Sequence, residues 1–93
     1  GLLMKFIRFK KHWATEFMGI DTNERFYEYD SSYELLNAEL IKHVYIVMDS
    51  KTEICVEYEQ LGSDMIHSLY ESFNTEDECL ARFNEIEKLL KED

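Results

Sequence analysis

The stretch FNTEDECLARFNEIEKLLKED, residues 73–93, carries the strongest fold signal in the chain. Thr75 followed by Glu78 forms a capping box, and the acidic residues after Thr75 suit the positive end of a helix dipole. Apolar residues then recur every three or four positions, as on one face of an amphipathic helix: Cys79, Leu80, Phe83, Ile86, Leu89 and Leu90. The pattern predicts a C-terminal helix over about residues 75–91.

This helix needs an apolar surface to cover, and KHVYIVMDSKTEICVEYEQ, residues 42–60, is predicted to supply it. Apolar residues alternate with other residues on both sides of the central DSK, which is typical of a β-hairpin. A loop with an odd number of residues would place these side chains on one face: Val44, Ile46, Met48, Ile54, Val56 and Tyr58. The stretch MIHSLYES, residues 65–72, predicts a further strand.

The N-terminal third also reads as strands. EFMGID and RFYEY flank the polar residues 21–24 and predict another hairpin. MKFIRFKKHWAT, residues 4–15, is apolar at its centre on both faces, so it predicts a first strand and not a basic arm for phosphates. Its Arg8 and Lys10 are expected to lie beside the strand that carries Glu53, Glu57 and Glu59. The segment 31–42 fits a capped helix and, equally well, a short strand followed by a turn.

Together these elements predict one α+β domain over residues 1–93. Its sheet is expected to be antiparallel and bent, with five to seven short strands that could close like a barrel, and the C-terminal helix would cap it. A chain of 93 residues can bury a sufficient core without a metal or a disulfide. Gly1 to Leu3, ahead of Met4, are expected to be a remnant of cloning.

Charge limits the functional classes. The chain has a formal net charge of -10, and all of its 20 acidic residues follow position 15. Such a chain repels phosphate, so neither direct nucleic-acid binding nor binding to an anionic membrane is expected. No apolar run approaches the roughly 18 to 20 residues of a membrane span, and no signal-peptide pattern is present. A cytoplasmic protein is predicted.

Sequence signatures of catalysis are absent. The chain has no Gly-rich phosphate loop, no GxSxG, no HExxH and no CxxC. We therefore predict no catalytic residue, no metal site and no cofactor. Cys55 and Cys79 are expected to be reduced thiols. A small thiol-dependent enzyme, using Cys55 with His43 or His67, is the least favoured alternative.

Two groups of residues are candidates for partner binding. Tyr27, Tyr29 and Tyr33 lie close together among charges, and tyrosine is enriched in protein interfaces. Glu53, Glu57 and Glu59 share one face of a predicted strand. That face is either solvated or a surface that imitates nucleic-acid phosphates.

The leading prediction is a small, acidic, non-enzymatic module that binds a protein partner as its regulator or inhibitor. A homodimer formed through an edge strand is a related expectation, because a small sheet leaves strand edges open. The alternative is an acidic nucleic-acid mimic, a phage-type inhibitor that occupies the groove of a basic DNA- or RNA-binding enzyme.

Overall fold

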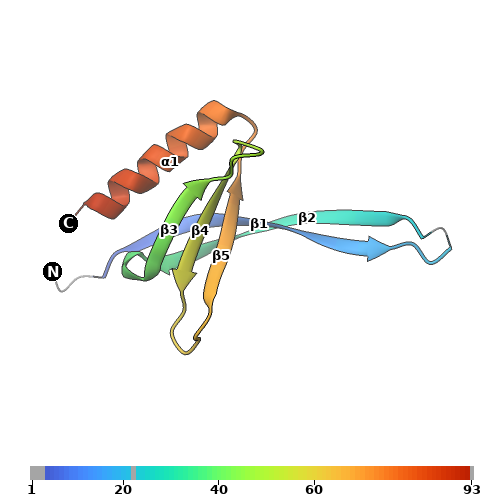
Figure 1. The fold of residues 1–93 in the computed structure, drawn as a ribbon, viewed down its shortest axis with the longest axis horizontal. Coiled ribbons are helices and arrows are strands. Elements are labelled where there is room, and N and C mark those ends of the chain that lie inside the picture. Colours follow the sequence, from blue (N-terminus) through green and yellow to red (C-terminus); the bar gives the residue numbers. More distant parts are fainter. Residues whose placement is uncertain (1–3, 22, 93) are drawn as a thin grey trace.

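The computed structural model describes residues 4–21 and 23–92, which form five strands in two antiparallel sheets and one C-terminal helix (Figure 1). The elements in chain order are β1 (Phe6–Met18), β2 (Arg25–Asn37), a 3-10 turn (Ala38–Leu40), β3 (Ile41–Ile46), β4 (Glu53–Glu59), β5 (Ile66–Ser72) and α1 (Glu76–Lys91). The predicted α+β class and C-terminal helix are confirmed. The expectation for residues 1–3 lies outside the described residues.

The expected single, barrel-like sheet is wrong. β1 and β2 pair only with each other, whereas β3, β4 and β5 form a separate sheet with β4 in the middle. β1 and β2 are also long, with 13 residues each, because no bulge, proline or interior glycine interrupts either strand. A long ribbon that runs past the other sheet cannot close a barrel with it.

Only the first half of the β1–β2 hairpin packs against the rest of the chain. Near its base, Ile7 and Phe9 on β1 and Leu36 on β2 are buried. From Trp13 to Met18 and from Arg25 to Asp30, every strand residue is exposed. Figure 1 shows this second half projecting away from the other elements, along the molecule's longest dimension of 58 Å.

The three-stranded sheet has the predicted alternation. Val44 lies opposite Val56 and Ile46 opposite Ile54, so the apolar residues of β3 and β4 share the inner face. Met48 falls beyond the end of β3 and is exposed, because the connection between the two strands is longer than the three residues expected.

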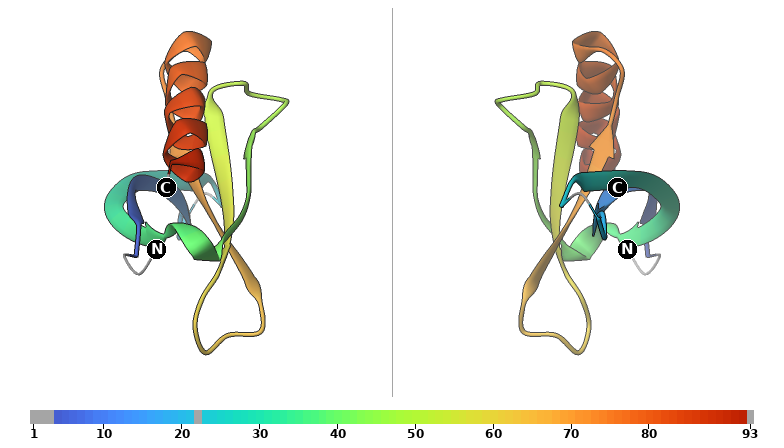
Figure 2. Two further views of the ribbon diagram at one scale, coloured as in Figure 1. Left: turned by 90° about the vertical axis from the view of Figure 1, so that its left-hand side faces the viewer. Right: turned by 90° about the vertical axis from the view of Figure 1, so that its right-hand side faces the viewer.

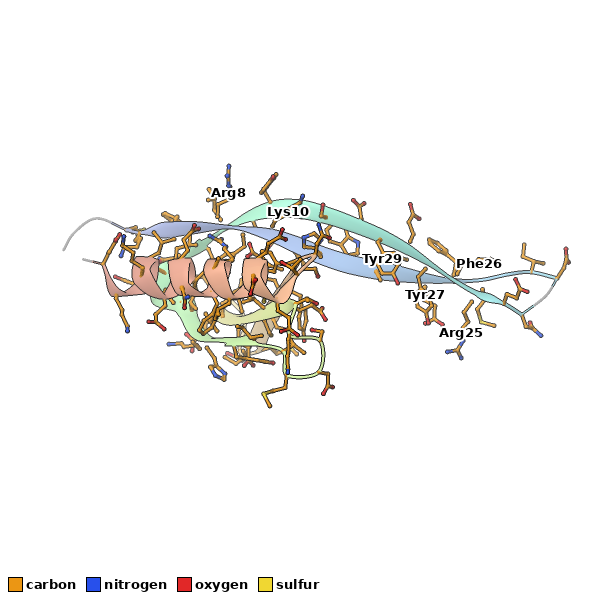
Figure 3. The ribbon with its side chains drawn as sticks, turned by 90° about the horizontal axis from the view of Figure 1, so that it is seen from above. Arg8, Lys10, Arg25, Phe26, Tyr27 and Tyr29 are labelled. Carbon is orange, nitrogen blue, oxygen red and sulfur yellow. The ribbon has the colours of Figure 1, made fainter. Side chains whose placement is uncertain are left out.

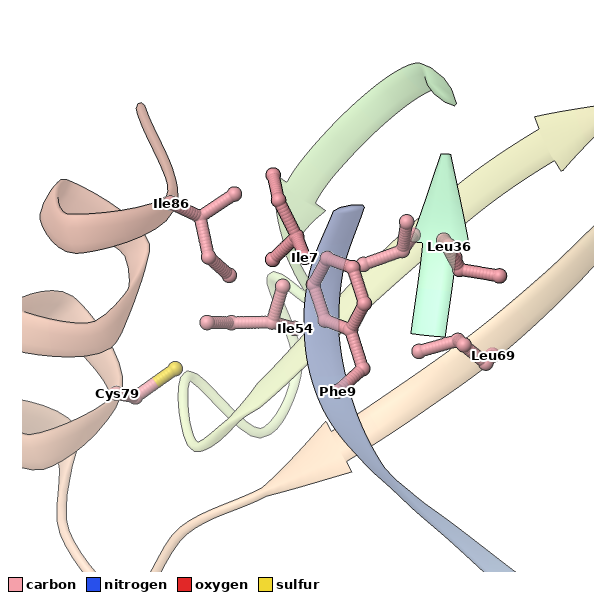
Figure 4. Packing of buried hydrophobic residues seen from close by; sticks show 8 residues of the cluster. Ile7, Phe9, Leu36, Ile54, Leu69, Cys79 and Ile86 are labelled. Carbon is pink, nitrogen blue, oxygen red and sulfur yellow. The ribbon is translucent and has the colours of Figure 1, made fainter. Parts of the chain in front are cut away.

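The core lies between the hairpin base, this inner face and α1. Figure 4 shows Cys79 and Ile86 of α1 pointing toward Ile7 and Ile54. The buried cluster consists of Ile7, Phe9, Leu36, Ile54, Val56, Leu69, Cys79 and Ile86. α1 begins as the capping box predicts, since the Thr75 hydroxyl accepts the Glu78 N–H at 3.2 Å. At its end, the Lys5 ammonium donates to the carbonyl of Leu89 at 2.7 Å.

The ambiguous segment 31–42 is a strand followed by a turn, and the helical alternative is wrong. β2 continues to Asn37, because the first residues of β1 lie opposite and supply its pairing partner. The Asn37 side chain then accepts the Glu39 N–H at 3.0 Å and closes the 3-10 turn. None of the helices in the described part of the chain is long and apolar enough to cross a membrane.

Candidate protein-interaction arm

The projecting half of the hairpin, residues 13–21 and 23–30, is called the arm below. Side chains directly opposite in an antiparallel pair share a face, so Phe17 and Phe26 lie on one face of the arm and Ala14 and Tyr29 on the other. Exposed large apolar or aromatic side chains occur on both faces and at the tip: Trp13, Phe17, Met18, Ile20, Phe26, Tyr27 and Tyr29. Ile20, at the tip, is 98% exposed. Several large apolar side chains exposed in one segment are typical of interaction sites.

In the described part of the chain, most of these side chains are not covered by another element, whereas Trp13 and Tyr29 line a groove beside the three-stranded sheet. Figure 3 shows Phe26 and Tyr27 leaving the ribbon away from the other elements. A two-stranded hairpin alone in water is marginally stable, and sheets normally need a third strand or a packed face. The arm therefore has unpaired strand edges and uncovered faces.

Charge divides the hairpin into two halves. Residues 13–30 contain five acidic residues and one basic residue, Arg25, whose Nε lies 3.2 Å from Glu16 Oε1 across the strands. At the base of the hairpin, β1 carries basic side chains. There the Arg8 guanidinium lies 5.0 Å and the Lys10 ammonium 6.0 Å from the centre of the Tyr33 ring. The hairpin thus has an acidic end and a basic base.

The expected pairing of Arg8 and Lys10 with the acidic residues of β4 is wrong, because β2 is the strand that lies beside β1. The basic side chains beside β4 come from β3. His43 Nδ1 lies 3.1 Å from Glu57 Oε1, and Lys42 Nζ lies 3.6 Å from Glu59 Oε1.

The structure brings only some of the sequence candidates together. Tyr27, Tyr29 and Tyr33 share one exposed face of β2, and Tyr29 is the most open at 78% exposed. A groove of about 560 Å³ between the hairpin and the three-stranded sheet joins Tyr29 to Glu53. Its other lining residues are His12, Trp13, Ala14, Asp30, Tyr70 and Ser72. The remaining candidates do not line this groove.

A buried ion pair anchors the hairpin base. Glu71 on β5 is only 4% exposed, and its Oε1 accepts from Arg82 Nε at 2.9 Å. Arg82 Nη2 also donates to the Arg8 carbonyl at 2.8 Å, while Glu71 Oε2 accepts the Lys10 N–H at 2.8 Å. Burial alone would lower the pKa of Arg82, but the hydrogen bonds and charges of Glu71 and Glu85 together outweigh it and raise that pKa. These contacts join β1, β5 and α1.

Both thiols are buried, Cys79 in the core and Cys55 on the other face of β4. Cys55 is 1% and Cys79 0% exposed, and burial raises the pKa of Cys79. Tyr45 and Tyr70 lie opposite Cys55 on the two neighbouring strands. A hydrogen bond with Cys55, together with its charge, raises the pKa of Tyr45 to about 12. Within residues 4–21 and 23–92, no group of three or more His, Cys, Asp and Glu side chains could hold a metal ion.

Sequence reasoning missed the apolar residues of the arm other than the tyrosines. The available signal was that apolar residues occupy both odd and even positions on each side of the predicted turn at 21–24, as Phe17 and Met18 do. Neither face of such a hairpin can be an ordinary solvated face. No family model, curated protein or solved structure matches this chain.

Proposed function

We propose that this chain is a non-enzymatic protein-binding module that regulates or inhibits a partner protein through its arm. The observation that carries the proposal is the arm itself, which projects from the fold with aromatic side chains exposed on both faces. Burying apolar surface contributes about 25 cal/mol per Å² before the costs of association. Tyrosine, tryptophan and phenylalanine are the residues that interfaces favour.

The arm also indicates the chemistry of the partner. With five acidic residues against one basic residue, it fits an apolar cleft with a basic rim. Opposite charge would speed the encounter, and the aromatic side chains would hold the complex.

The nucleic-acid-mimic alternative draws its support from the acidic arm and not from β4, where Glu57 and Glu59 already lie against basic side chains. The salt dependence of partner binding distinguishes the two functions. A complex that depends on charge weakens steeply as salt rises, whereas one held by buried aromatic side chains weakens little.

The test compares the parent chain with two triple variants in capture from a lysate of the source cells, followed by titration of the captured protein. The arm variant carries Trp13→Ser, Phe26→Ser and Tyr29→Ser. The control variant changes three exposed apolar residues in other loops, Met48→Ser, Leu61→Ser and Met65→Ser. We expect a partner that the parent and control bind alike and the arm variant binds at least about tenfold more weakly, a loss of about 1.4 kcal/mol. Undiminished binding by the arm variant would refute the proposal.

A further inference from the structure

The groove of about 560 Å³ lies where the arm leaves the fold, between the hairpin and one end of the three-stranded sheet. Figure 2 shows the hairpin and α1 on the same side of that sheet, and Figure 1 shows the hairpin passing beside β5 before the arm projects. The volume is within the range of ligand sites. Strands β1, β2, β4 and β5 all contribute to its lining, which consists of His12, Trp13, Ala14, Tyr29, Asp30, Glu53, Tyr70 and Ser72.

Three aromatic side chains line the groove from three different strands. Trp13 belongs to β1, Tyr29 to β2 and Tyr70 to β5. Trp13 and Tyr70 are 39% and 40% exposed, so part of each ring is open to a ligand, and Tyr29 is more open still. Ala14 lies opposite Tyr29, and its small side chain leaves room at this point of the groove. Aromatic faces attract cations, and several rings around one space are a common way for proteins to bind an ammonium group.

The charges around the groove are negative. Asp30 and Glu53 contribute carboxylates from opposite walls, and apart from His12 no lining residue can carry a positive charge. Neither carboxylate belongs to an ion pair within residues 4–21 and 23–92. A hydrogen bond with the neighbouring cysteine raises the pKa of Tyr70, and the charge of Glu53 adds to the rise, so this carboxylate lies close to the Tyr70 hydroxyl. The groove therefore combines aromatic rings with unpaired negative charge.

We propose that this groove binds the side chain of a lysine of the partner protein. The alkyl stem of the lysine packs on Trp13 and Tyr70, and its ammonium group lies between Asp30 and Glu53. Lysine fits better than arginine. Its compact ammonium donates in several directions and can reach carboxylates on two walls, whereas the planar guanidinium suits one carboxylate held by two parallel bonds. The inference rests on the proposed function for the source of the lysine, and it names one residue type in the basic rim of the partner.

The outer edge of β1 favours a lysine within a peptide over a free ammonium compound. The Gly19 N–H donates to the Glu24 carbonyl at 2.8 Å, and bonded pairs alternate in an antiparallel ladder. Even-numbered residues of β1 therefore direct their N–H and C=O groups away from β2, as the Lys10 N–H does toward Glu71. The outward groups of Ala14 lie at the groove and can bond to the backbone of an extended peptide.

The first test is a titration that needs no partner. Trp13 is the one tryptophan of the chain, so its indole N–H signal in a two-dimensional NMR spectrum reports on the groove directly. The probes are the end-blocked peptides Gly-Gly-Lys-Gly-Gly and Gly-Gly-Gln-Gly-Gly, at constant ionic strength and at a pH of about 8, above the ordinary pKa of histidine. We expect a saturable shift with the lysine peptide and at least about tenfold weaker binding of the glutamine peptide. Equal binding of the two peptides, or no shift with either, overturns the proposal.

Two double variants that change net charge equally locate the site. Asp30→Asn with Glu53→Gln neutralises the groove, whereas Glu39→Gln with Asp64→Asn removes the same charge from exposed positions outside it. The first should weaken binding of the lysine peptide at least about tenfold and the second less than about twofold. Equal weakening would mean that the peptide responds to net charge alone, and it overturns the proposal.

Butylammonium chloride separates the two sources of an ammonium group, because it carries the lysine side chain without a peptide backbone. The lysine peptide should bind at least about threefold more tightly. Equal or tighter binding of butylammonium would indicate a free ligand and overturns the assignment to a partner protein. The capture experiment tests the proposed function separately. If the arm variant loses the partner while Asp30→Asn with Glu53→Gln keeps full affinity for it, the proposed function stands and the lysine site is wrong. A parent chain that captures no partner counts against the proposed function alone.

Discussion

The side chain of Arg82 joins three elements, because it bonds to Glu71 of β5 and to the backbone of Arg8 on β1 while belonging to α1. Arg82→Ala leaves the Glu71 carboxylate buried without its cation, and we expect a loss of about 3 to 5 kcal/mol in the free energy of unfolding. Urea denaturation measures it. Glu85→Ala is the control, since Glu85 is an exposed partner of Arg82, and it should cost under about 1 kcal/mol. Equal losses would mean that the pair does not hold the hairpin base.

The reactivity of the two cysteines tests the least favoured functional alternative, a small thiol-dependent enzyme. The thiolate is the reactive form, and the raised pKa of Cys79 leaves less thiolate at neutral pH. With Cys55 also buried, native protein should react slowly with a thiol reagent, and both cysteines should react at once in denaturant. The rate at Cys79 should rise with pH until its raised pKa is passed. Fast, stoichiometric labelling of native protein at neutral pH would favour thiol chemistry.

Single residues show how far the sequence could predict the candidate site. The shared face of Tyr27, Tyr29 and Tyr33 follows from their odd spacing on one strand. Their exposure to solvent does not follow from the spacing, because alternation cannot reveal whether a hairpin packs along its whole length. The basic side chains beside Glu57 and Glu59 could not be predicted either, since they depend on the irregular register of β3 against β4 between Ile41 and His43.

Among the elements, α1 is the one that the sequence predicts most clearly. Its capping box and apolar stripe define the helix, but they do not rank the side chains of the stripe by burial. Ile86 is fully buried, whereas Phe83 is only partly so and lines a surface groove beside β3. Ile86→Ala should therefore cost about 2 to 5 kcal/mol, and Phe83→Ala less. Chemical denaturation that shows the reverse order would mean that the helix is rotated about its axis.

The hairpin is the element that the sequence predicted least well. Its turn and strands were expected, but its length and separation from the other sheet were not. Strand patterns report which side chains share a face and say little about where a sheet ends. The choice between helix and strand at residues 31–37 likewise depended on partner residues 6–12, which lie 19 to 31 positions earlier in the chain.

Shortening the arm tests whether it contributes to the stability of the fold. Residues 16–27 are replaced by Asn-Gly, a favoured two-residue hairpin turn, between Thr15 and its opposite residue Glu28. Because the described residues of this segment other than Gly19 are exposed, the midpoint of denaturation should stay nearly unchanged, with a difference under about 1 kcal/mol. Partner binding should be lost. A strongly destabilised short variant would show that the arm packs against the body.

At the scale of the whole molecule, the division of charge along the hairpin has a measurable effect. Arg8→Glu with Lys10→Glu reverses the charge of the base, and Lys88→Glu with Lys91→Glu makes the same change in net charge on α1. The first pair should lower the free energy of unfolding more than the second at low salt, because it also removes the contacts of Arg8 and Lys10 with the Tyr33 ring, and the difference should shrink as salt rises. Urea denaturation of both variants across a salt series measures it. Equal losses would leave net repulsion as the cause.

The contact between Lys5 and the end of α1 has a consequence for synthesis. Ile7 and Phe9 in β1 are buried in the same cluster as Ile86 in α1. A ribosome releases β1 and β2 well before it releases that helix. The aromatic hairpin must therefore wait in an open state until α1 has been released, and during that interval the nascent chain is most exposed to chaperones, to proteases and to pairing with a neighbouring nascent chain.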